Sequence, residues 1–445
     1  KIVVFLAIPQ PDTMLRREFL TQSLRASAIA LLPNPTNLFA ACTEDIPIRA
    51  ITQGPKSHWF GYYDKWQFDP SGRYVLGMEV DVPRRSPTEN DIIKIGMVDL
   101  ENNDPEGQPR WIEVGESNVW GWQQGCMLQW IPDSKDELIW NDQKDGQYVS
   151  RILSRKSGQE RVLPKPIYAL SPDGKFAVGT EFNRIQNMRP GYGYPGIPDP
   201  YADQKTPDEI GLYRMDLQSG ESKLIFSLAQ AAAIPYQGKS LEDKWHYFNH
   251  LLVSPDSKRM IFLHRWRNAP VNAPGAASGG FMTRMFTINI DGSDPYILDP
   301  SGYTSHFIWR DPEHICAWTK PEGKKAAFYL FKDKTDEVEI VGDGKMLVNG
   351  HNTYIPNTNG EWILNDTYPS NDQKRLQTLY LYHVPTDRKV VLGQFYEPPI
   401  FKGEWRCDLH PRSNQQGTQI VFDSTHQNGQ RQMYLADISK IIENS

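Results

Sequence analysis

A strand–turn–strand pattern occurs seven times along this chain of 445 residues and constrains its fold more than any other feature. In each copy an apolar run leads into a turn rich in Pro, Asp and Gly, and a second apolar run follows. The copies are WQFDPSGRYVLG, LQWIPDSKDELIW, IYALSPDGKFAVG, LLVSPDSKRMIFL, FIWRDPEHICAW, TYIPNTNGEWIL and PRSNQQGTQIVF. Most copies continue with a third and a fourth apolar run. Four short strands per unit are typical of a propeller blade, so the sequence predicts an all-β, seven-bladed β-propeller of four-stranded blades.

The two ends of the repeat region define the predicted domain. The seventh copy ends close to the C-terminus, where only KIIENS remains to form a fourth strand. We therefore expect residues 47–52 (PIRAIT) to supply that strand and close the ring, which makes residues 46–445 a single propeller domain. One short helix is expected at 227–237.

Residues 1–45 have the pattern of an export signal preceded by upstream residues. Met14 stands before Arg16-Arg17-Glu18-Phe19-Leu20, which matches the twin-arginine export pattern, and an apolar stretch follows. Two chance arginines are the alternative. The motif predicts export to the periplasm or the extracellular space. Cys42 is a candidate lipidation site, although Phe39 fits that motif poorly.

Composition argues against several kinds of partner. The formal net charge of −6 disfavours binding to nucleic acid or to an anionic membrane surface. No run of about 18 apolar residues occurs after position 45, so no membrane span is expected. The cysteines of the repeat region lie far apart and form no CxxC motif, so we expect buried free thiols at Cys126, Cys316 and Cys407. We also expect the protein to be a monomer.

Histidine recurs at one register of the repeat. When the copies are aligned on the turn, the fifth residue before its Pro-equivalent position is, in chain order, Lys65, Met127, Ile167, His250, His306, His351 and His410. First strands line the channel of a propeller and their entry loops form one mouth of it, so these residues should lie in a ring on that face. Imidazole binds transition metals and exchanges protons near neutral pH. The four histidines therefore predict a metal site or an acid–base site, and four hydrogen-bonded core histidines are the alternative.

Aromatic and hydrogen-bonding side chains are concentrated in the segments that enter the same face. They suit a carbohydrate, because sugars present apolar faces and many hydroxyl groups, whereas aromatic packing between blades is the alternative. The long insertion at 183–209 adds arginines that can bind a carboxylate and tyrosines that can donate a proton. The candidates for substrate binding are Trp59, Tyr62, Tyr63, Trp122, Gln124, Tyr192 and Arg265, and the catalytic candidates of the insertion are Arg184, Arg189 and Tyr194.

The histidine-bearing strands resemble those of a known family. The Ser-Pro-Asp-Gly turns are similar to TolB-like repeats in general, whereas FNHLLVSPDSKRMIFLH, SHFIWRDPEHICAW and GHNTYIPNTNGEWIL resemble the oligogalacturonate lyases, which are seven-bladed propellers. The resemblance covers residues 47–438, approximately. It implies His250 as a base and His306 and His351 as ligands of a divalent metal, Mn before Zn or Ca.

One part of the family's pattern differs in this chain. The Gln and paired-histidine ligand motif of the family is not intact here, since Asn349 and Gly350 precede His351. His410 is the candidate substitute. The predicted metal ligands are therefore His306, His351 and His410.

The resemblance implies β-elimination from a uronic-acid oligosaccharide or polysaccharide. The C5 proton of a uronate is weakly acidic, so the enzyme must neutralise the carboxylate and offer a base. A metal with Arg189 or Arg184 would bind the carboxylate, and His250 would take the proton. His246 or Tyr194 would protonate the leaving oxygen.

Two other functions stay open at the level of sequence. One is a non-catalytic, TolB-like propeller that binds a glycan or a protein at the same face. The other is a glycoside hydrolase, which needs a facing pair of carboxylates. Asp64 and Asp408 lie near entry strands, but no second signal pairs them.

Overall fold

The structure, a computed structural model, describes residues 46–104, 107, 109–271 and 280–443. These residues belong to the unit that spans Phe39–Ser445. The predicted export signal and the candidate lipidation site at Cys42 lie outside the described residues, so both stay predictions. No helix within the described ranges is long and apolar enough to cross a bilayer.

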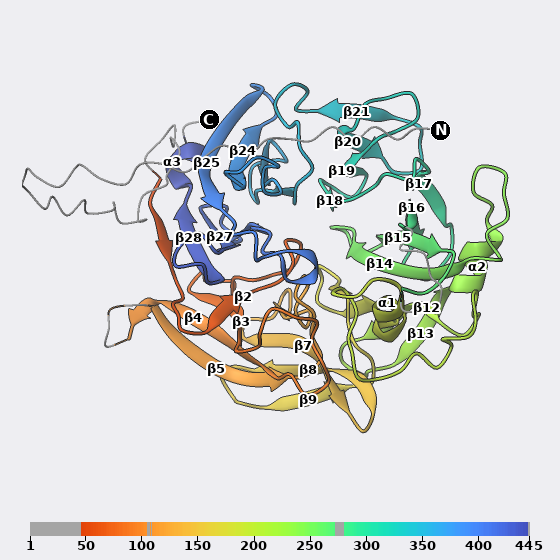
Figure 1. Cartoon of the computed structure of the whole chain (residues 1–445), viewed down its shortest axis with the longest axis horizontal. Helices are drawn as coiled ribbons and strands as arrows, with labels where there is room; N and C mark the ends of the chain where they lie inside the picture. Colours follow the sequence, from red (N-terminus) through yellow and green to blue (C-terminus); the bar gives the residue numbers. More distant parts are fainter. Residues whose placement is uncertain (1–45, 105–106, 108, 272–279, 444–445) are drawn as a thin grey trace, which may run out of the picture. The chain divides into compact units, whose positions relative to one another are not determined.

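Seven antiparallel sheets of four strands each form the propeller, as the sequence predicts. The sheets follow one another around a ring in chain order (Figure 1). Blade 1 contains β2 (Ser57–Trp59), β3 (Tyr74–Val80), β4 (Ile93–Asn103) and β5 (Pro109–Ser117). Blade 2 contains β6 (Gln129–Trp130), β7 (Glu137–Lys144), β8 (Gln147–Ser154) and β9 (Glu160–Leu163). Blade 3 contains β10 (Ala169–Leu170), β11 (Phe176–Gly179), β12 (Gly211–Asp216) and β13 (Ser222–Ser227).

The last four blades carry the histidines. Blade 4 contains β14 (Trp245–Val253), β15 (Arg259–Arg267), β16 (Met282–Asn289) and β17 (Tyr296–Asp299). Blade 5 contains β18 (Phe307–Trp309), β19 (His314–Thr319), β20 (Ala327–Lys332) and β21 (Val338–Val341). Blade 6 contains β22 (Thr353–Tyr354), β23 (Trp362–Asn365), β24 (Leu376–His383) and β25 (Arg388–Tyr396). Blade 7 contains β26 (Arg412–Ser413), β27 (Gln419–Ser424), β28 (Gln432–Asp437) and β1 (Ile48–Ala50).

The strand β1 closes the ring. It pairs antiparallel with β28, with Ile48 opposite Ala436 and Ala50 opposite Tyr434. In Figure 1 the red N-terminal strand accordingly lies beside the blue C-terminal blade. The prediction that residues 47–52 supply the outer strand of the seventh blade is confirmed, and the two ends of the described chain share one sheet.

Short turns bring neighbouring blades into contact. In blade 3, Gly174 has a φ of 67° in the turn between β10 and β11, a conformation that glycine adopts without strain. A Cβ atom at this position would lie 2.2 Å from the carbonyl oxygen of Pro132, in the equivalent turn of blade 2. The Pro/Asp/Gly turns that define the repeat therefore also pack one blade against the next.

Apolar side chains pack between the blades. One hydrophobic cluster joins blades 7, 1 and 2 and includes Trp59, Trp122 and Val421. The cysteines of the described residues are buried free thiols, as predicted, at Cys126, Cys316 and Cys407.

Antiparallel pairing sorts the connections of every blade onto two faces, because successive strands run in opposite directions. One side of the ring carries the segments that lead into the first strands and the connections from second to third strands. We call this side the entry face. The other side carries the turns from first to second strands and from third to fourth strands. We call this side the turn face. The histidine register and the insertion at 183–209 therefore both belong to the entry face.

Helices are short in the described part of the chain. They are α1 (Phe182–Met188), α2 (Leu228–Ala233), the 3-10 helix η1 (Gly403–Trp405) and α3 (Ser439–Glu443). The helix expected at 227–237 is confirmed as α2. It begins with a capping box, in which the Ser227 hydroxyl accepts from the Gln230 amide while the Gln230 side chain accepts from the Ser227 amide.

The helix α1 lies where the sequence predicted only a loop, at the start of the 183–209 insertion. Its residues Phe182, Ile185 and Met188 follow helical spacing and are buried in the core that blade 3 shares with its neighbours. Prolines and glycines further along the insertion obscured the pattern of this short amphipathic helix. The helix fixes the first part of the insertion on the entry face.

Candidate functional site

The structure brings the four register histidines together on the entry face. His250 lies in β14, and the others lie one or two residues before β18, β22 and β26. Ring centroids of His250 and His306 are 6.4 Å apart, those of His306 and His351 4.2 Å, and those of His351 and His410 4.1 Å. All four side chains are buried. A shared position in the repeat therefore becomes one contiguous cluster.

Backbone irregularities aim two of these histidines. The pairing of β14 with β15 shifts register between Asn249 and Leu252, and His250 within this bulge has a φ of 54°. A bulge of this kind redirects a side chain relative to its strand. The His250 amide donates to the Tyr168 hydroxyl at 2.8 Å, which stabilises the conformation. His410 also has a positive φ, 42°.

A candidate metal site is formed by His351, Asp408 and His410, whose ligand atoms all lie within 4.8 Å of one another. The two Nε2 atoms of the histidines are 3.2 Å apart, and Nε2 of His410 is 3.8 Å from Oδ2 of Asp408. Oδ1 of Asp408 is buried and has no hydrogen-bond partner among the described residues. Two imidazoles and an open carboxylate oxygen fit a divalent transition metal.

Asp366 orients this set from behind. Nδ1 of His351 lies 2.9 Å and 3.0 Å from the two carboxylate oxygens of Asp366. The backbone amides of His351 and His410 also donate to this carboxylate, at 2.7 Å and 3.1 Å. Because Nδ1–H of His351 donates to Asp366, its Nε2 keeps the lone pair that a metal ligand requires. A carboxylate behind a ligating histidine is a common arrangement at metal sites.

His306, which the sequence predicts as a ligand, lies beside this set rather than within it. Its Nδ1 is 3.0 Å from Oδ1 of Asn349, and its Nε2 is 3.3 Å from the Tyr368 hydroxyl. The group of ligand atoms within 4.8 Å contains Asp408 in its place. In the sequence, Asp408 was recognised only as a carboxylate near an entry strand, with no signal that pairs it with another group. The signal that was available is its position two residues before His410, since alternate residues of an extended segment point to the same side.

Burial and nearby positive charge favour the neutral form of His250, His306 and His410. Burial lowers the pKa of His250 well below the ordinary value, and the charges of Lys65 and Arg265 lower it further. Burial also lowers the pKa values of His306 and His410 well below the ordinary value, with His351 as a further cause in both cases. Neutral imidazoles can accept a proton or bind a metal.

Residues of blade 1 surround His250. The Tyr63 hydroxyl lies 3.2 Å from Nε2 of His250 and donates to the Phe307 carbonyl at 2.9 Å. Oδ2 of Asp64 lies 3.7 Å from the same nitrogen, and Nζ of Lys65 lies 2.9 Å from Oδ1 of Asp64. The carboxylate of Asp64 and the ammonium of Lys65 are buried and make no hydrogen bond of good geometry within the described structure. Such groups are available to a ligand or to water.

The Tyr62 ring contacts both His250 and His410. Its ring centroid lies 5.1 Å from that of His250 and 5.1 Å from that of His410. The predicted substrate-binding residues Tyr62 and Tyr63 therefore do lie at the histidine cluster.

Arginines and a tyrosine form a second wall of the site. Nη2 of Arg406 donates to the Tyr192 hydroxyl at 2.8 Å, and the guanidinium of Arg189 lies 4.0 Å from the Tyr192 ring centroid. Arg189 and Arg265 both lie over the Phe281 ring, at 4.8 Å and 4.5 Å. Burial alone would raise the pKa of Tyr192, but the charges of Arg406 and Arg189 lower it below the ordinary value. Arg406 was not found from the sequence.

Three predicted site residues of blades 1 and 2 have other partners. Trp59 and Trp122 are buried in a hydrophobic cluster with ring centroids 5.8 Å apart, so packing replaces the predicted contact with a sugar. The Trp122 indole donates to the Arg85 carbonyl at 2.7 Å. Gln124 is buried and accepts from the Tyr168 hydroxyl at 2.9 Å, which places it behind His250.

The predicted catalytic residues Arg184, Tyr194 and His246 also have partners within the protein. Arg184 is buried, pairs with Asp199 at 3.2 Å, and donates to backbone carbonyls of the insertion and of His246. The Tyr194 ring stacks on another core ring at 4.2 Å, and its hydroxyl accepts from Asn141. Both ring nitrogens of His246 have partners within the protein. These side chains hold the insertion and the core together.

No family model and no curated protein matches the chain. Solved structures do share its fold. An oligogalacturonate lyase in complex with manganese superposes with a TM-score of 0.62 at 17% identity, covering 91% of this chain and 96% of that chain. The oligogalacturonate lyase from Vibrio parahaemolyticus superposes with a TM-score of 0.60 at 14% identity, covering 90% and 96%. The predicted resemblance to these propellers is thereby confirmed at the level of fold.

Proposed function

We propose that this protein is a lyase that cleaves a uronic-acid glycan by metal-assisted β-elimination at the entry face. The observation that carries the proposal is the juxtaposition of a neutral, buried His250 with the His351–Asp408–His410 set. Elimination needs a base together with positive charge for the uronate carboxylate. His250 would supply the base, and a metal ion held by the His351–Asp408–His410 set would supply the charge. The fold shared with two oligogalacturonate lyases supports the same assignment.

His351, Asp408 and His410 would hold the metal, and His306 is the candidate fourth ligand. When bound, a divalent cation neutralises the uronate carboxylate and so makes the C5 proton more acidic. Mn²⁺ is the first candidate, because a carboxylate with imidazoles suits it and because one structural neighbour is a manganese complex. Zn²⁺ and Ca²⁺ are the alternatives.

The protein's own groups account for the proton transfers. Nε2 of His250 takes the C5 proton, the electrons of that bond form the C4–C5 double bond, and the bond from C4 to the leaving oxygen breaks. The leaving oxygen takes a proton from Tyr192, whose lowered pKa makes it a better acid than an ordinary tyrosine. Arg189 and Arg265 bind the negative charge of the glycan.

The N-terminal motif adds a location to this proposal. The twin-arginine pattern at 16–20 supports export, so we place the reaction in the periplasm or outside the cell, where acidic polysaccharides are accessible. We further propose that the monomer is the active form. The described site draws on blades of one chain, from His250 in blade 4 to Asp408 at the entry of blade 7.

Substitution of two histidines tests the reaction and separates their roles. His250→Ala should lower the rate of absorbance increase near 235 nm by about 10²–10⁴-fold on uronate oligosaccharides, because the base is lost. Its bound metal, measured by elemental analysis, should not change. His351→Ala should lose both activity and metal. His314→Ala, on the turn face beside Asp311, is the matched control and should retain both.

Other outcomes select the other functions. New reducing ends without absorbance would indicate a hydrolase that uses Asp64 and Asp408. Binding of the glycan without either product would indicate a binding propeller. Near-full activity of His250→Ala, or loss of its metal, would contradict the assignment of the base.

A further inference from the structure

A groove of about 650 Å³ opens on the entry face beside the histidine cluster. One wall comes from residues 345–348, which lead from blade 5 into blade 6, and the other from residues 367–374, which connect β23 to β24. Both are entry-face connections. The size is within the range of about 300–1,000 Å³ that is usual for ligand sites.

Both walls continue directly into the candidate active site. The residue after Val348 is Asn349, which holds Nδ1 of His306 at 3.0 Å. The residue before Thr367 is Asp366, which holds His351. The backbone of each wall therefore leads directly to a residue that holds a histidine of the cluster.

One side chain belongs to the groove and to the cluster alike. Tyr368 lines the groove, and its hydroxyl lies 3.3 Å from Nε2 of His306. Its ring centroid lies 5.5 Å from that of His351. The groove thus begins where the proposed reaction takes place.

The groove has the chemistry of an acidic sugar site. Lys345 and Lys374 are exposed at its rim, and Nζ of Lys389 lies 3.8 Å from the Tyr380 ring centroid. Leu347 is 67% exposed and Val348 47% exposed, so apolar surface accompanies the positive charge. Sugars with carboxylates present the complementary combination of apolar C–H faces and negative charge.

One carboxylate, that of Asp372, lines the groove, and it already accepts hydrogen bonds from residues of its own loop. Oδ1 of Asp372 accepts from the Ser370 hydroxyl at 2.5 Å and from the amides of Lys374 and Arg375 at 3.1 Å and 3.2 Å. The charged side chains that line the groove therefore leave an excess of positive charge. An anionic chain fits this balance better than a neutral one.

We propose that this groove binds further uronate residues of the same glycan chain whose cleaved bond lies at the histidines. The inference rests on the proposed lyase function and adds to it a preference for long chains over disaccharides. Each added uronate carries a carboxylate for the lysines and a ring face for Tyr368 or Leu347. The groove is thus a distal binding site of the enzyme.

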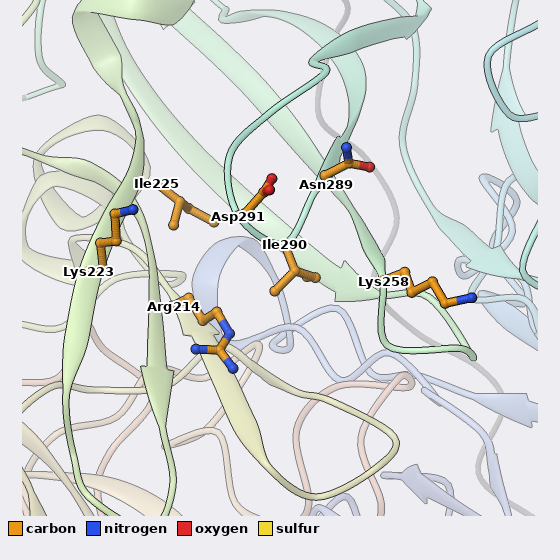
Figure 2. Close-up of a pocket in the computed structure, with 7 residues that line it drawn as sticks. All are labelled: Arg214, Lys223, Ile225, Lys258, Asn289, Ile290 and Asp291. Carbon is orange, nitrogen blue, oxygen red and sulfur yellow. The ribbon is translucent and has the colours of Figure 1, made fainter.

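A second groove supplies a matched control. It measures about 590 Å³ and is lined by Arg214, Lys223 and Lys258 together with residues 289–291 (Figure 2). Lys258 lies in the turn between β14 and β15, and residues 290–291 directly follow β16, which places this groove on the turn face. It has lysines in similar number but no continuity with the histidine connections.

The test compares binding of digalacturonate and hexagalacturonate by calorimetry. The protein is the Mn-loaded His250→Ala variant, which leaves the chains uncut. The hexamer should bind about tenfold more tightly than the dimer, because the exposed lysine–carboxylate contacts contribute about a tenfold factor in total. Adding Lys345→Ala and Lys374→Ala should reduce this ratio to about twofold. Adding Lys223→Ala and Lys258→Ala should leave the ratio unchanged.

Three outcomes would contradict the proposal that the groove binds further uronate residues. They are equal binding of both lengths, an unchanged ratio in the Lys345→Ala/Lys374→Ala variant, and an equal fall of the ratio in the turn-face control. If the wild-type enzyme cleaves the dimer while the hexamer gains nothing, the distal site alone is wrong. If neither length binds and none is cleaved, the distal site is overturned together with the proposed function for this sugar.

Discussion

Two clusters of buried histidines lie on the entry-face half of this propeller, and they differ in how completely their hydrogen bonds are made. The closed cluster is His246 with His264, in blade 4. The open cluster is His351 with His410, where blades 6 and 7 begin. In both, two imidazole nitrogens from different residues approach within about 3 Å, at 2.8 Å and 3.2 Å.

The closed cluster satisfies its own polar groups. Nδ1 of His246 lies 2.8 Å from Nε2 of His264, and Nε2 of His246 lies 2.8 Å from the Leu241 carbonyl. Nε of Arg284 donates to Nδ1 of His264 at 3.1 Å. Arg284 also donates to carbonyls at the end of α2, among them that of Ala231. This cluster therefore ties a helix to the blade and leaves no nitrogen for a ligand.

The open cluster leaves ligand atoms facing one another. Ligand atoms of His351, His410 and Asp408 lie within 4.8 Å of one another, while Asp366 holds Nδ1 of His351. Oδ2 of Asp408 accepts from Nε of Arg406 at 2.7 Å, and Oδ1 of Asp408 has no hydrogen-bond partner among the described residues. Buried polar groups without partners cost free energy unless something binds them. Two histidines close together thus do not by themselves indicate a ligand site. Buried polar atoms without hydrogen-bond partners beside them are the feature that distinguishes the open cluster.

The largest expected effect comes from truncating each cluster in turn. His410→Ala removes a proposed ligand, so metal affinity should fall by more than the 10–100-fold that loss of an outer partner costs. His264→Ala should keep the metal but lower the free energy of unfolding by about 1–3 kcal/mol, because Nε of Arg284 and Nδ1 of His246 lose a buried partner. Metal titration and urea unfolding of both variants measure the two quantities. Loss of metal in His264→Ala would abolish the distinction between the clusters.

The comparison also explains which parts of the molecule could be predicted from sequence. The blade count, the closing strand and the shared register of His250 with three other histidines depend on a local pattern that repeats. Asp366 depends on blade packing, since it is 15 residues from His351 and 44 from His410 in the chain. The partner of His246 could not be found from the sequence either, because His264 lies on the next strand of the sheet.

The next largest effect is expected in the free energy of unfolding at acidic pH. This effect depends on the closed cluster. Burial, with the charges of Arg184 and Arg284, lowers the pKa of His246 to about 4, below the ordinary value of 6.5. Between these pH values the unfolded chain therefore binds more protons than the folded protein. The contribution of neutral His246 to the stability of the folded protein is complete above pH 6.5 and is lost as the pH falls to 4. Between pH 7 and pH 4 the loss amounts to about 3 kcal/mol.

Urea unfolding at several pH values checks this expectation. The wild-type protein should lose about 3 kcal/mol more over that range than His246→Gln, which has no proton to gain at this position. The glutamine variant keeps a polar side chain of similar length opposite His264. Identical pH profiles of the two proteins would show that His246 is not held neutral by the fold.

The smallest expected effect tests the carboxylate behind the open cluster. Asp366→Asn keeps the shape of the side chain but removes the charge that fixes the tautomer of His351, so metal affinity should fall by about 10–100-fold. The fold should survive, because an amide oxygen can still accept from the amides of His351 and His410. Metal titration measures the affinity, and Asp256→Asn, in a turn-face loop of blade 4, is the matched control. An unchanged affinity in Asp366→Asn would mean that the open cluster does not depend on Asp366 for its orientation, and the contrast with the closed cluster would then rest on Asp408 and the two facing nitrogens alone.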